Sequence, residues 1–325
     1  MRGLISLAYA LATCIAAAFP ITAAAQPYPA RAIKVILPFP AGSATDGPAR
    51  LIAEELRKKL GQPVIIENQT GADGQIAAQA VKRAAPDGYT LFLSTNSTHA
   101  SNLSLYKSLP YDPERDFVPI AGMIRIPMIM LVRKDFPAED VAAFVKVAGQ
   151  RTATKPLTYG SGNTAGHIAA ELLKAATKVD MVHVPYRGSP QALQDLVGGH
   201  VDLLFGDPYT SMSLVNGGQL KVLGVADRVR HPLLPNVPTM AETGYKDVEL
   251  VAWSAFFAPA NTDPAITDRL NKEINDILAK PETVEALQKM AMVPMVMSPS
   301  ELSSFVSSEI ERWRRNVELA GIEKK

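Results

Sequence analysis

The feature that most constrains the fold is the alternation of short apolar runs with helical segments along the chain. The first unit, VILPFPAGSATDGPARLIAEELRKKLG (residues 35–61), is an apolar run, a loop of small and hydroxyl residues, and an amphipathic segment. Continuous β-branched runs are typical of strands that are buried on both faces of a parallel sheet. Because such runs alternate with helical segments, the sequence predicts an α/β fold with doubly wound sheets.

The chain carries two series of such units, at residues 32–95 and 128–226. A long apolar segment, VELVAWSAFFAPA, then suggests a strand that returns to the first series, and three amphipathic helical segments follow it. About 300 residues exceed what one core usually serves. We therefore predict two α/β lobes with parallel-type sheets, joined by two crossovers around a hinged cleft. The first lobe is expected to comprise residues 27–125 and 253–325, and the second residues 126–252.

Residues 1–25 have the pattern of a signal peptide. Arg2 supplies a positive charge, an apolar stretch follows, and TAAAQ offers a cleavage site after Ala25. No later segment supplies the roughly 20 apolar residues of a membrane-spanning helix. We therefore expect a protein of the periplasm. The only cysteine of the sequence, Cys14, lies in this segment; Thr13 disfavours lipid attachment there, and the processed chain has no thiol for disulfides or metal sites.

The charge balance and the loop sequences exclude several classes of partner. The formal net charge is +1, and removal of Arg2 with the signal brings it to about zero. Such a balance gives no electrostatic footprint for nucleic acid or anionic lipid. The loop GSATDG lacks the spacing of a dinucleotide fingerprint, and Pro48 and Ala49 stand where a phosphate-binding loop needs Lys and a hydroxyl residue. We predict no cofactor.

Four loops are expected at the carboxyl ends of strands, where open parallel sheets bind ligands: residues 38–46, 94–100, 159–167 and 205–211. The first and the third are alike, since each runs through Gly, Ser and Thr to the start of a helix. A helix N-terminus has unpaired N–H groups and a partial positive charge that favour an anion. Two such ends across a cleft would suit a carboxylate. The alternative is that the glycines only form tight turns and that Thr45 or Asp46 is only an N-cap.

The histidines show no metal-ligand spacing, so we predict no metal site. His99 and His167 lie in loops that are expected to face the cleft, and His183 is interpreted as a hydrogen-bonded core residue. Ser161 near His167 leaves a hydrolase or transferase as an alternative, although there is no G-x-S-x-G motif and no third member of a triad. Asp207 suits either a ligand amine or hydroxyl, or the cap of a helix. We expect no catalytic residues.

Six motifs, in order, resemble the Bug family, the extracytoplasmic solute receptors of tripartite tricarboxylate transporters. They are YPARAIKVILPFPAGSATD, LGQPVIIENQTGADG, APDGYTLFLST, LPYDPERDF, VHVPYRG and LPNVPTMAETG. The resemblance implies a type II periplasmic binding protein that closes on a small organic acid, a mono- or dicarboxylate, and delivers it to integral-membrane permease subunits. A sensor for a signalling system is a further alternative, because binding lobes are reused in that role. We expect a monomer.

The resemblance also implies which loops hold the carboxylate, through main-chain N–H groups, hydroxyls and ordered water. The ligand-binding residues that we predict in the first lobe are Phe39, Ala41, Ser43, Ala44, Thr45, Asp46, Thr95, Asn96 and His99; in the second they are Ser161, Asn163, Thr164, Ala165, His167 and Asp207. Where members of the family often read AGGGTD, this chain reads AGSATD. Ser43 and Ala44 would narrow the pocket and add one hydroxyl, and the bulk of Phe39, Tyr209 and Met212 would permit an aromatic acid.

Overall fold

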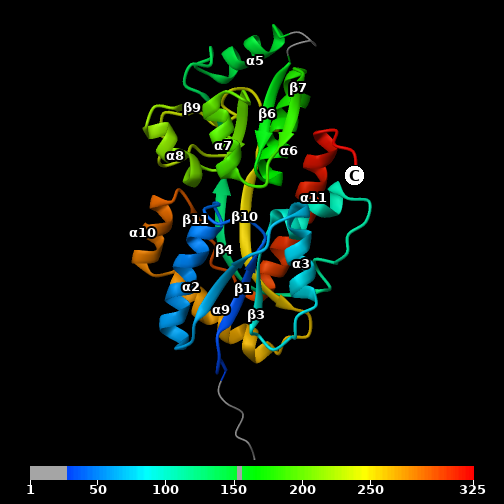
Figure 1. Cartoon of the computed structure of the whole chain (residues 1–325), viewed down its shortest axis with the longest axis vertical. Helices are drawn as coiled ribbons and strands as arrows, with labels where there is room; N and C mark the ends of the chain where they lie inside the picture. Colours follow the sequence, from blue (N-terminus) through cyan, green and yellow to red (C-terminus); the bar gives the residue numbers. More distant parts are fainter. Residues whose placement is uncertain (1–27, 152–155) are drawn as a thin grey trace, which may run out of the picture. The chain divides into compact units, whose positions relative to one another are not determined.

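The computed structural model describes residues 28–151 and 156–325, so the predicted signal peptide lies outside the described residues. Arg31–Lys325 forms one compact unit that is built around two β-sheets, as Figure 1 shows. Each sheet is packed with its own helices, which confirms the expected two-lobe α/β fold. In the described part of the chain, no helix combines the length and the apolar character that crossing a membrane requires.

The sheet of the first lobe has the strand order β11-β4-β10-β3-β1-β2. Its strands are β1 (Ile33–Leu37), β2 (Val64–Asn68), β3 (Thr90–Thr95), β4 (Phe117–Pro127), β10 (Val251–Pro259) and β11 (Val293–Pro294). β1 pairs in parallel with β2 and β3, as the alternation predicts. β10 is antiparallel to both β3 and β4, so the sheet is mixed. The two predicted series left residues 96–127 without a strand, whereas β4 begins at Phe117.

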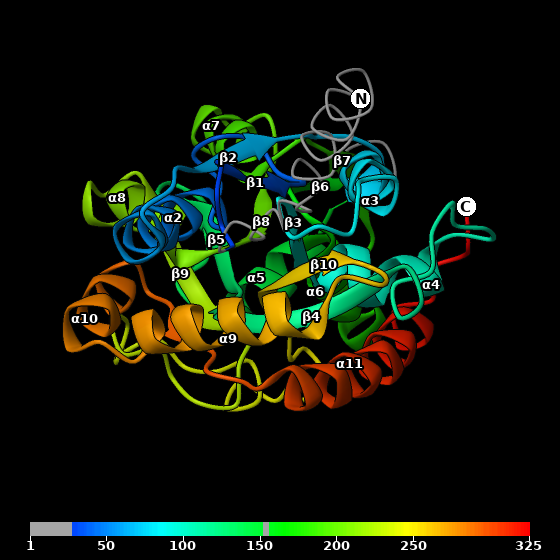
Figure 2. The same ribbon diagram turned by 90° about the horizontal axis from the view of Figure 1, so that it is seen from below.

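Helices cover the first sheet: α2 (Asp46–Leu60), η1 (Ala72–Gly74), α3 (Gln75–Lys82), η2 (Ser97–Ser101), α4 (Asn102–Leu105), α9 (Pro264–Leu278), α10 (Pro281–Lys289) and α11 (Pro299–Leu319). α2 buries Ala49, Ile52 and Leu56 at helical spacing. It ends at Gly61, whose φ of 69° is left-handed and therefore favours glycine. α9 and α11 both contact β4, and α2 contacts α9, as can be followed in Figure 2.

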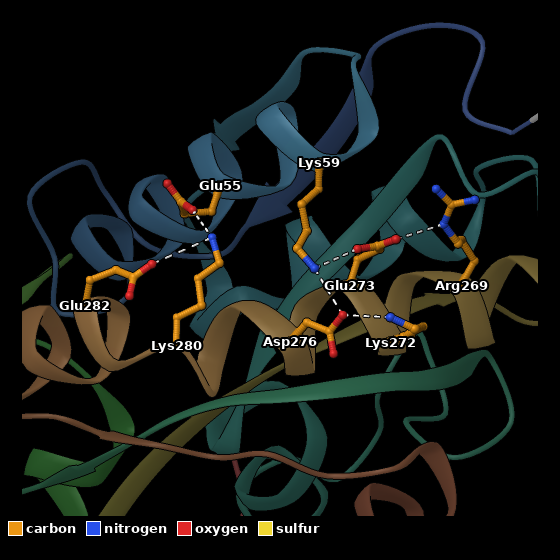
Figure 3. A network of polar contacts seen from close by, with 8 residues as sticks. All are labelled: Glu55, Lys59, Arg269, Lys272, Glu273, Asp276, Lys280 and Glu282. Carbon is orange, nitrogen blue, oxygen red and sulfur yellow. Dashed lines mark hydrogen bonds and ion pairs between the residues drawn. The ribbon is translucent and has the colours of Figure 1, made fainter.

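A network of ion pairs joins α2 to helices near the end of the chain (Figure 3). Lys59 Nζ lies 3.0 Å from a Glu273 oxygen and 3.1 Å from an Asp276 oxygen on α9. Lys280 Nζ, at the start of α10, lies 2.7 Å from a Glu55 oxygen on α2. A single pair at a protein surface contributes only about 0–1 kcal/mol. The significance of the network is that it connects segments more than 200 positions apart in the sequence.

The sheet of the second lobe has the order β7-β6-β8-β5-β9. Its elements are β5 (Ile129–Arg133), α5 (Val141–Gly149), β6 (Leu157–Ser161), α6 (Thr164–Thr177), β7 (Met181–Pro185), α7 (Ser189–Gly198), β8 (Leu203–Gly206), α8 (Pro208–Asn216) and β9 (Leu220–Val225). β6 pairs in parallel with β7 and β8, whereas β5 is antiparallel to β8 and β9. This sheet is therefore mixed as well.

The chain passes between the two sheets twice. The first passage is at Met128, between β4 and β5, and the second is through residues 226–250, before β10. β4 and β10 are paired along their whole length, and Val251 of β10 stands opposite Pro127 of β4. Both passages therefore leave the first sheet at the same end, and Ile126 and Ala252, which are register partners, lie there side by side.

Candidate ligand-binding site

Two adjoining cavities lie where the lobes meet. The central cavity has a volume of about 30 Å³, and the outer cavity has a volume of about 980 Å³. Phe39, Ser97, Gly162 and Asn163 line both. A cavity of 10–15 Å³ by this measure holds roughly one water molecule, so the central cavity accommodates a group of the size of a carboxyl. A longer ligand would extend past the shared residues into the outer cavity.

The structure distributes the predicted site residues unequally. The central cavity is lined by Phe39, Ser43, Ala44, Thr45, Thr95, Asn96, Asn163 and Asp207. Ser161, Thr164 and His167 line the outer cavity instead, together with Phe39 and Asn163. Ala41 is exposed, whereas Asp46, His99 and Ala165 are buried and line neither of these two cavities.

Asp46 holds the loop of the first lobe from behind the central cavity. Its carboxylate accepts hydrogen bonds from the amide of Gly42 at 3.0 Å, from Asn68 at 2.9 Å and from two nitrogens of Arg50. Burial by itself raises the pKa of Asp46, but these donors outweigh it and hold the pKa below the usual range. Asn68 also donates to the carbonyl of Phe39 at 2.8 Å. We infer that Asp46 positions the loop rather than the ligand.

Ser43 and Ala44, the two residues that were expected to narrow the pocket, both lie in the cavity wall. The preceding Gly42 has a φ of 76°, in the left-handed region that a turn here requires. The hydroxyl oxygen of Ser43 is buried and has no hydrogen-bond partner among the described residues. A buried hydroxyl without a partner is costly, so it is available to a bound molecule.

The predicted loop 94–100 is mostly helical, because β3 ends at Thr95 and η2 begins two residues later. Thr95 and Asn96 remain in the cavity wall, and the Asn96 side-chain oxygen accepts a hydrogen bond from the Trp253 amide at 3.3 Å. His99 does not face the cleft as expected. It is fully buried, with its ring centroid 3.9 Å from that of Phe257, and burial lowers its pKa to about 3.

In the second lobe, Asn163 is the N-cap of α6, and its side-chain oxygen accepts a hydrogen bond from the Gly166 amide at 2.8 Å. Ser161 pairs with His183, not with His167: its hydroxyl lies 2.7 Å from His183 Nε2. The rings of His167 and His183 stack with centroids 4.1 Å apart. Burial lowers the pKa of both histidines to about 4, so both are neutral at pH 7. His183 is only partly buried and lines the outer cavity, so it is not a core residue.

Asp207, the N-cap of α8, is fully buried in the wall of the central cavity. Its Oδ1 accepts hydrogen bonds of 2.8 Å from the backbone amide and from the hydroxyl of Thr210. Oδ2 is buried without a partner among the described residues. Burial raises the pKa of Asp207, and the hydrogen bonds from Thr210 and the nearby Ser189 side chain oppose this effect, although Ser189 makes no hydrogen bond to Oδ2 in the structure.

The outer cavity contains charged groups that the central cavity lacks. Lys325 Nζ lies 2.9 Å from an Asp73 carboxylate oxygen, and the Tyr106 hydroxyl donates to the same oxygen at 2.5 Å. Arg187, which is exposed, also lines this cavity. Among the residues that the structure describes, no cluster of three or more His, Cys, Asp and Glu is suited to a metal ion.

Sequence reasoning missed much of the wall of the central cavity. Ile126 comes from the end of β4, Ala252 and Trp253 come from the start of β10, and Met128 comes from the first passage between the lobes. Ser97 and Ser189 are the first residues of η2 and α7, and Gly162 lies in the loop before α6. The indole nitrogen of Trp253 donates to Glu309 on α11 at 2.7 Å, which fixes the ring. The hydroxyl residues around Ser97 offered a weak signal, whereas Ser189 stands between Gly188 and Pro190 and offered none. The four apolar residues gave no signal of a binding site, because apolar residues in such runs are expected to fill the buried interior of a sheet.

The lobes also touch beside the cavities. A Cβ on Gly47 of α2 would lie 2.4 Å from the Tyr209 hydroxyl oxygen, and a Cβ on Gly188 would lie 2.6 Å from Pro40 Cγ. Only glycine allows such approach. Tyr209 and Met212 line neither the central nor the outer cavity, so of the three bulky residues only Phe39 bears on the choice of an aromatic acid.

Comparison with known proteins agrees with this geometry. The family described as "Tripartite tricarboxylate transporter family receptor" matches residues 48–322. The chain belongs to this receptor family. Protein BugT of Bordetella pertussis is 34% identical to it over 298 residues, which cover 91% of this chain and 91% of that protein. The resemblance to the Bug family is thereby confirmed.

Solved structures of related receptors share the fold. Rpa4515 of R. palustris, solved with adipate, has a TM-score of 0.88 and 34% identity, and the match covers 92% of this chain and 100% of that one. MatC (Rpa3494) from Rhodopseudomonas palustris, solved with bound malate, has a TM-score of 0.83 and 34% identity, with 89% and 100% covered. Both of those receptors were solved with a carboxylate.

Proposed function

We propose that this chain is an extracytoplasmic receptor that captures a small organic carboxylate between its lobes and delivers it to a membrane permease of the tripartite tricarboxylate type. The observation that carries the proposal is the central cavity, where hydroxyl and amide side chains of both lobes converge beside Thr45 and Asn163, the N-caps of α2 and α6. The carboxylates bound by two related receptors support the same ligand class.

Neutral donors hold the acid in this proposal. A helix N-terminus favours an anion by about 0.3–1 kcal/mol, and by roughly 2 kcal/mol when it is partly buried. Each lobe contributes one helix N-terminus, and both N-termini contact the anion only when the lobes are closed. The bound anion therefore stabilises the closed conformation. The ligand thereby shifts the population toward closure, and the permease can distinguish a loaded receptor from an empty one.

The hydrogen bond between Ser161 and His183 is the observation that favours the alternative of a hydrolase or transferase. A Ser–His pair needs a third group to orient the base. Among the described residues, no carboxylate hydrogen-bonds to His183. Incubation with candidate esters and amides, followed by NMR, tests this alternative: turnover that Ser161→Ala abolishes would establish an enzyme.

A thermal-shift screen of the purified protein tests the proposed function. The panel contains adipate, L-malate, succinate, citrate and benzoate, with glucose and choline as neutral and cationic controls. An acid present at a hundred times its Kd stabilises the protein by about 2.7 kcal/mol. We expect at least one acid, and neither control, to raise the melting temperature. A shift with glucose or choline alone would refute the proposal. Loss of uptake of that acid in cells that lack the chain tests delivery.

A further inference from the structure

Asp207 is the only ionisable residue among the described residues that line the central cavity. Its role as the cap of α8 uses Oδ1 alone, which accepts both hydrogen bonds from Thr210. Oδ2 lies fully buried in the cavity wall with no partner in the described part of the chain. Since buried polar atoms are nearly always hydrogen-bonded, this oxygen is available to form a hydrogen bond with a bound ligand.

A carboxylate in the same cavity would be a second acidic group beside Asp207. No Lys, Arg or His is among the described lining residues to compensate two negative charges. Two carboxyl groups that share a water-poor site cannot both ionise, and they hold one proton between them. Oδ1 already accepts two hydrogen bonds, so Oδ2 is the atom of Asp207 that can carry this proton.

We propose that Asp207 binds the ligand in its protonated form and donates its Oδ2 proton in a hydrogen bond to a carboxylate oxygen of the acid. When the acid binds to a receptor in which Asp207 is ionised, binding is then accompanied by the uptake of one proton from solvent. The proposal rests on the proposed function, because it requires a carboxylate in the central cavity. It assigns Asp207 as a ligand-contacting residue that makes affinity depend on pH.

Other ionisable groups do not account for such a dependence above about pH 6. His167 on α6 and His183 on β7 have pKa values lowered to about 4 by burial, so they are neutral there. Elements packed on β8 and α8 carry further charges, but these are paired outside the central cavity: Arg133 with Asp135, Lys174 with Glu171, Lys221 with Glu139, Arg50 with Asp46, and Asp195 with Tyr186.

Isothermal titration of adipate, L-malate and succinate between about pH 6 and 9 tests the proposal. For the wild type, we expect the Kd to rise with pH by up to about tenfold per unit once Asp207 ionises in the empty receptor. Buffers of low and high ionisation enthalpy should report proton uptake in the same range.

Asp207→Asn separates the proton from the shape of the side chain. The amide keeps an oxygen for the Thr210 hydrogen bonds and places N–H donors where the proton was. We expect this variant to bind the acid without pH dependence and without proton uptake. Asp140→Asn is the matched control, because Asp140 caps α5 through a 2.7 Å hydrogen bond from the Ala143 amide and lines neither cavity. It should behave as the wild type.

Two outcomes overturn the proposal while leaving the receptor function intact. One is wild-type binding of an acid with constant affinity and no proton uptake across the range. The other is a folded Asp207→Asn variant that loses affinity more than about a hundredfold at every pH, because an ionised Asp207 would then accept from a ligand hydroxyl or ammonium. If no carboxylate binds the wild type, the proposed function fails, and this proposal fails with it. The wild-type titration decides the matter even if the variant does not fold.

Discussion

The central and outer cavities adjoin, but they differ in chemistry. The central cavity is walled by neutral donors, by apolar strand residues and by one buried acid. The outer cavity is about thirty times larger by the two volumes of 30 and 980 Å³, and it carries the stacked histidines and the ion pair of Lys325 with Asp73. Two loops of similar sequence, 38–46 and 159–167, therefore contribute mainly to different cavities. Phe39, Ser43, Ala44 and Thr45 of the first loop line the central cavity. Residues 161–164 and His167 of the second loop line the outer cavity.

Trp253→Ala should have the largest effect on the free energy of unfolding, because the wall of the central cavity is also part of the hydrophobic core. The side chain is 1% exposed, and truncating a buried Trp costs about 3–5 kcal/mol of stability. Tyr106→Ala, in the half-buried wall of the outer cavity, should cost at least about 2 kcal/mol less. Urea unfolding measures both. Equal losses would show that the two walls do not differ in their contribution to stability.

Gly47→Ala should impair closure without harming the first lobe. Alanine favours the helix by about 1 kcal/mol over glycine, yet its Cβ would meet the Tyr209 hydroxyl across the interface. Overpacking of this kind costs roughly 1–3 kcal/mol, so ligand affinity should fall about tenfold or more. Adding Tyr209→Ala should restore it. Calorimetric titration of the single and double variants decides; no rescue would mean that the contact does not govern closure.

Thr45→Val and Thr164→Val compare the helix ends at the two cavities. Thr45 is the N-cap of α2 but makes no side-chain cap hydrogen bond, so its replacement spares the helix. Loss of one hydroxyl in the central cavity should weaken ligand binding by about 1 kcal/mol, roughly fivefold. Thr164 lines the outer cavity, and its replacement should change the Kd less than about twofold. The reverse order would place the ligand's carboxyl group in the outer cavity.

Replacing the stacked histidines should give the smallest effect at neutral pH, where both are uncharged, and a visible effect only in acid. Their pKa values near 4 lie below the ordinary value of about 6.5, so between these values the unfolded chain binds more protons. Stability therefore falls as the pH falls through this window. In the variant His167→Asn with His183→Gln, the loss of stability between about pH 7 and 4.5 should shrink by at least about 2 kcal/mol. Urea unfolding at several pH values measures it, and an unchanged loss would contradict the assignment.

The sequence predicted the elements whose burial follows a simple period. β1 is a β-branched run, and α2 buries a regular stripe, so both lie where they were expected. β4 was missed because Pro119 reads as a break. In the structure Pro119 stands beside a register shift in the pairing of β4 with β10, where the lack of an N–H is tolerated.

The central cavity could be predicted only in part, because its wall depends on packing across the chain. Ser43 and Thr45 are marked by their place in a strand-to-helix loop, and they lie in the wall. Trp253 and Met128 reach it only because β4 and β10 leave the sheet together, which no local pattern records. His99 was wrongly predicted to face the cleft. It lies in a helical turn that directs its ring into the aromatic core, and this direction cannot be inferred when residues 94–100 are taken as a loop.

The ion-pair network of α2 with α9 and α10 has a consequence for the order of folding. The first lobe is assembled from both ends of the chain, whereas β5 to β9 are contiguous in sequence. A chain that emerges from its N-terminus can complete the second lobe early, but α2 gains its ionic neighbours on α9 and α10 only after residues 273–280 have appeared. Long sequence separation slows such closure. The lobe that begins first therefore finishes last.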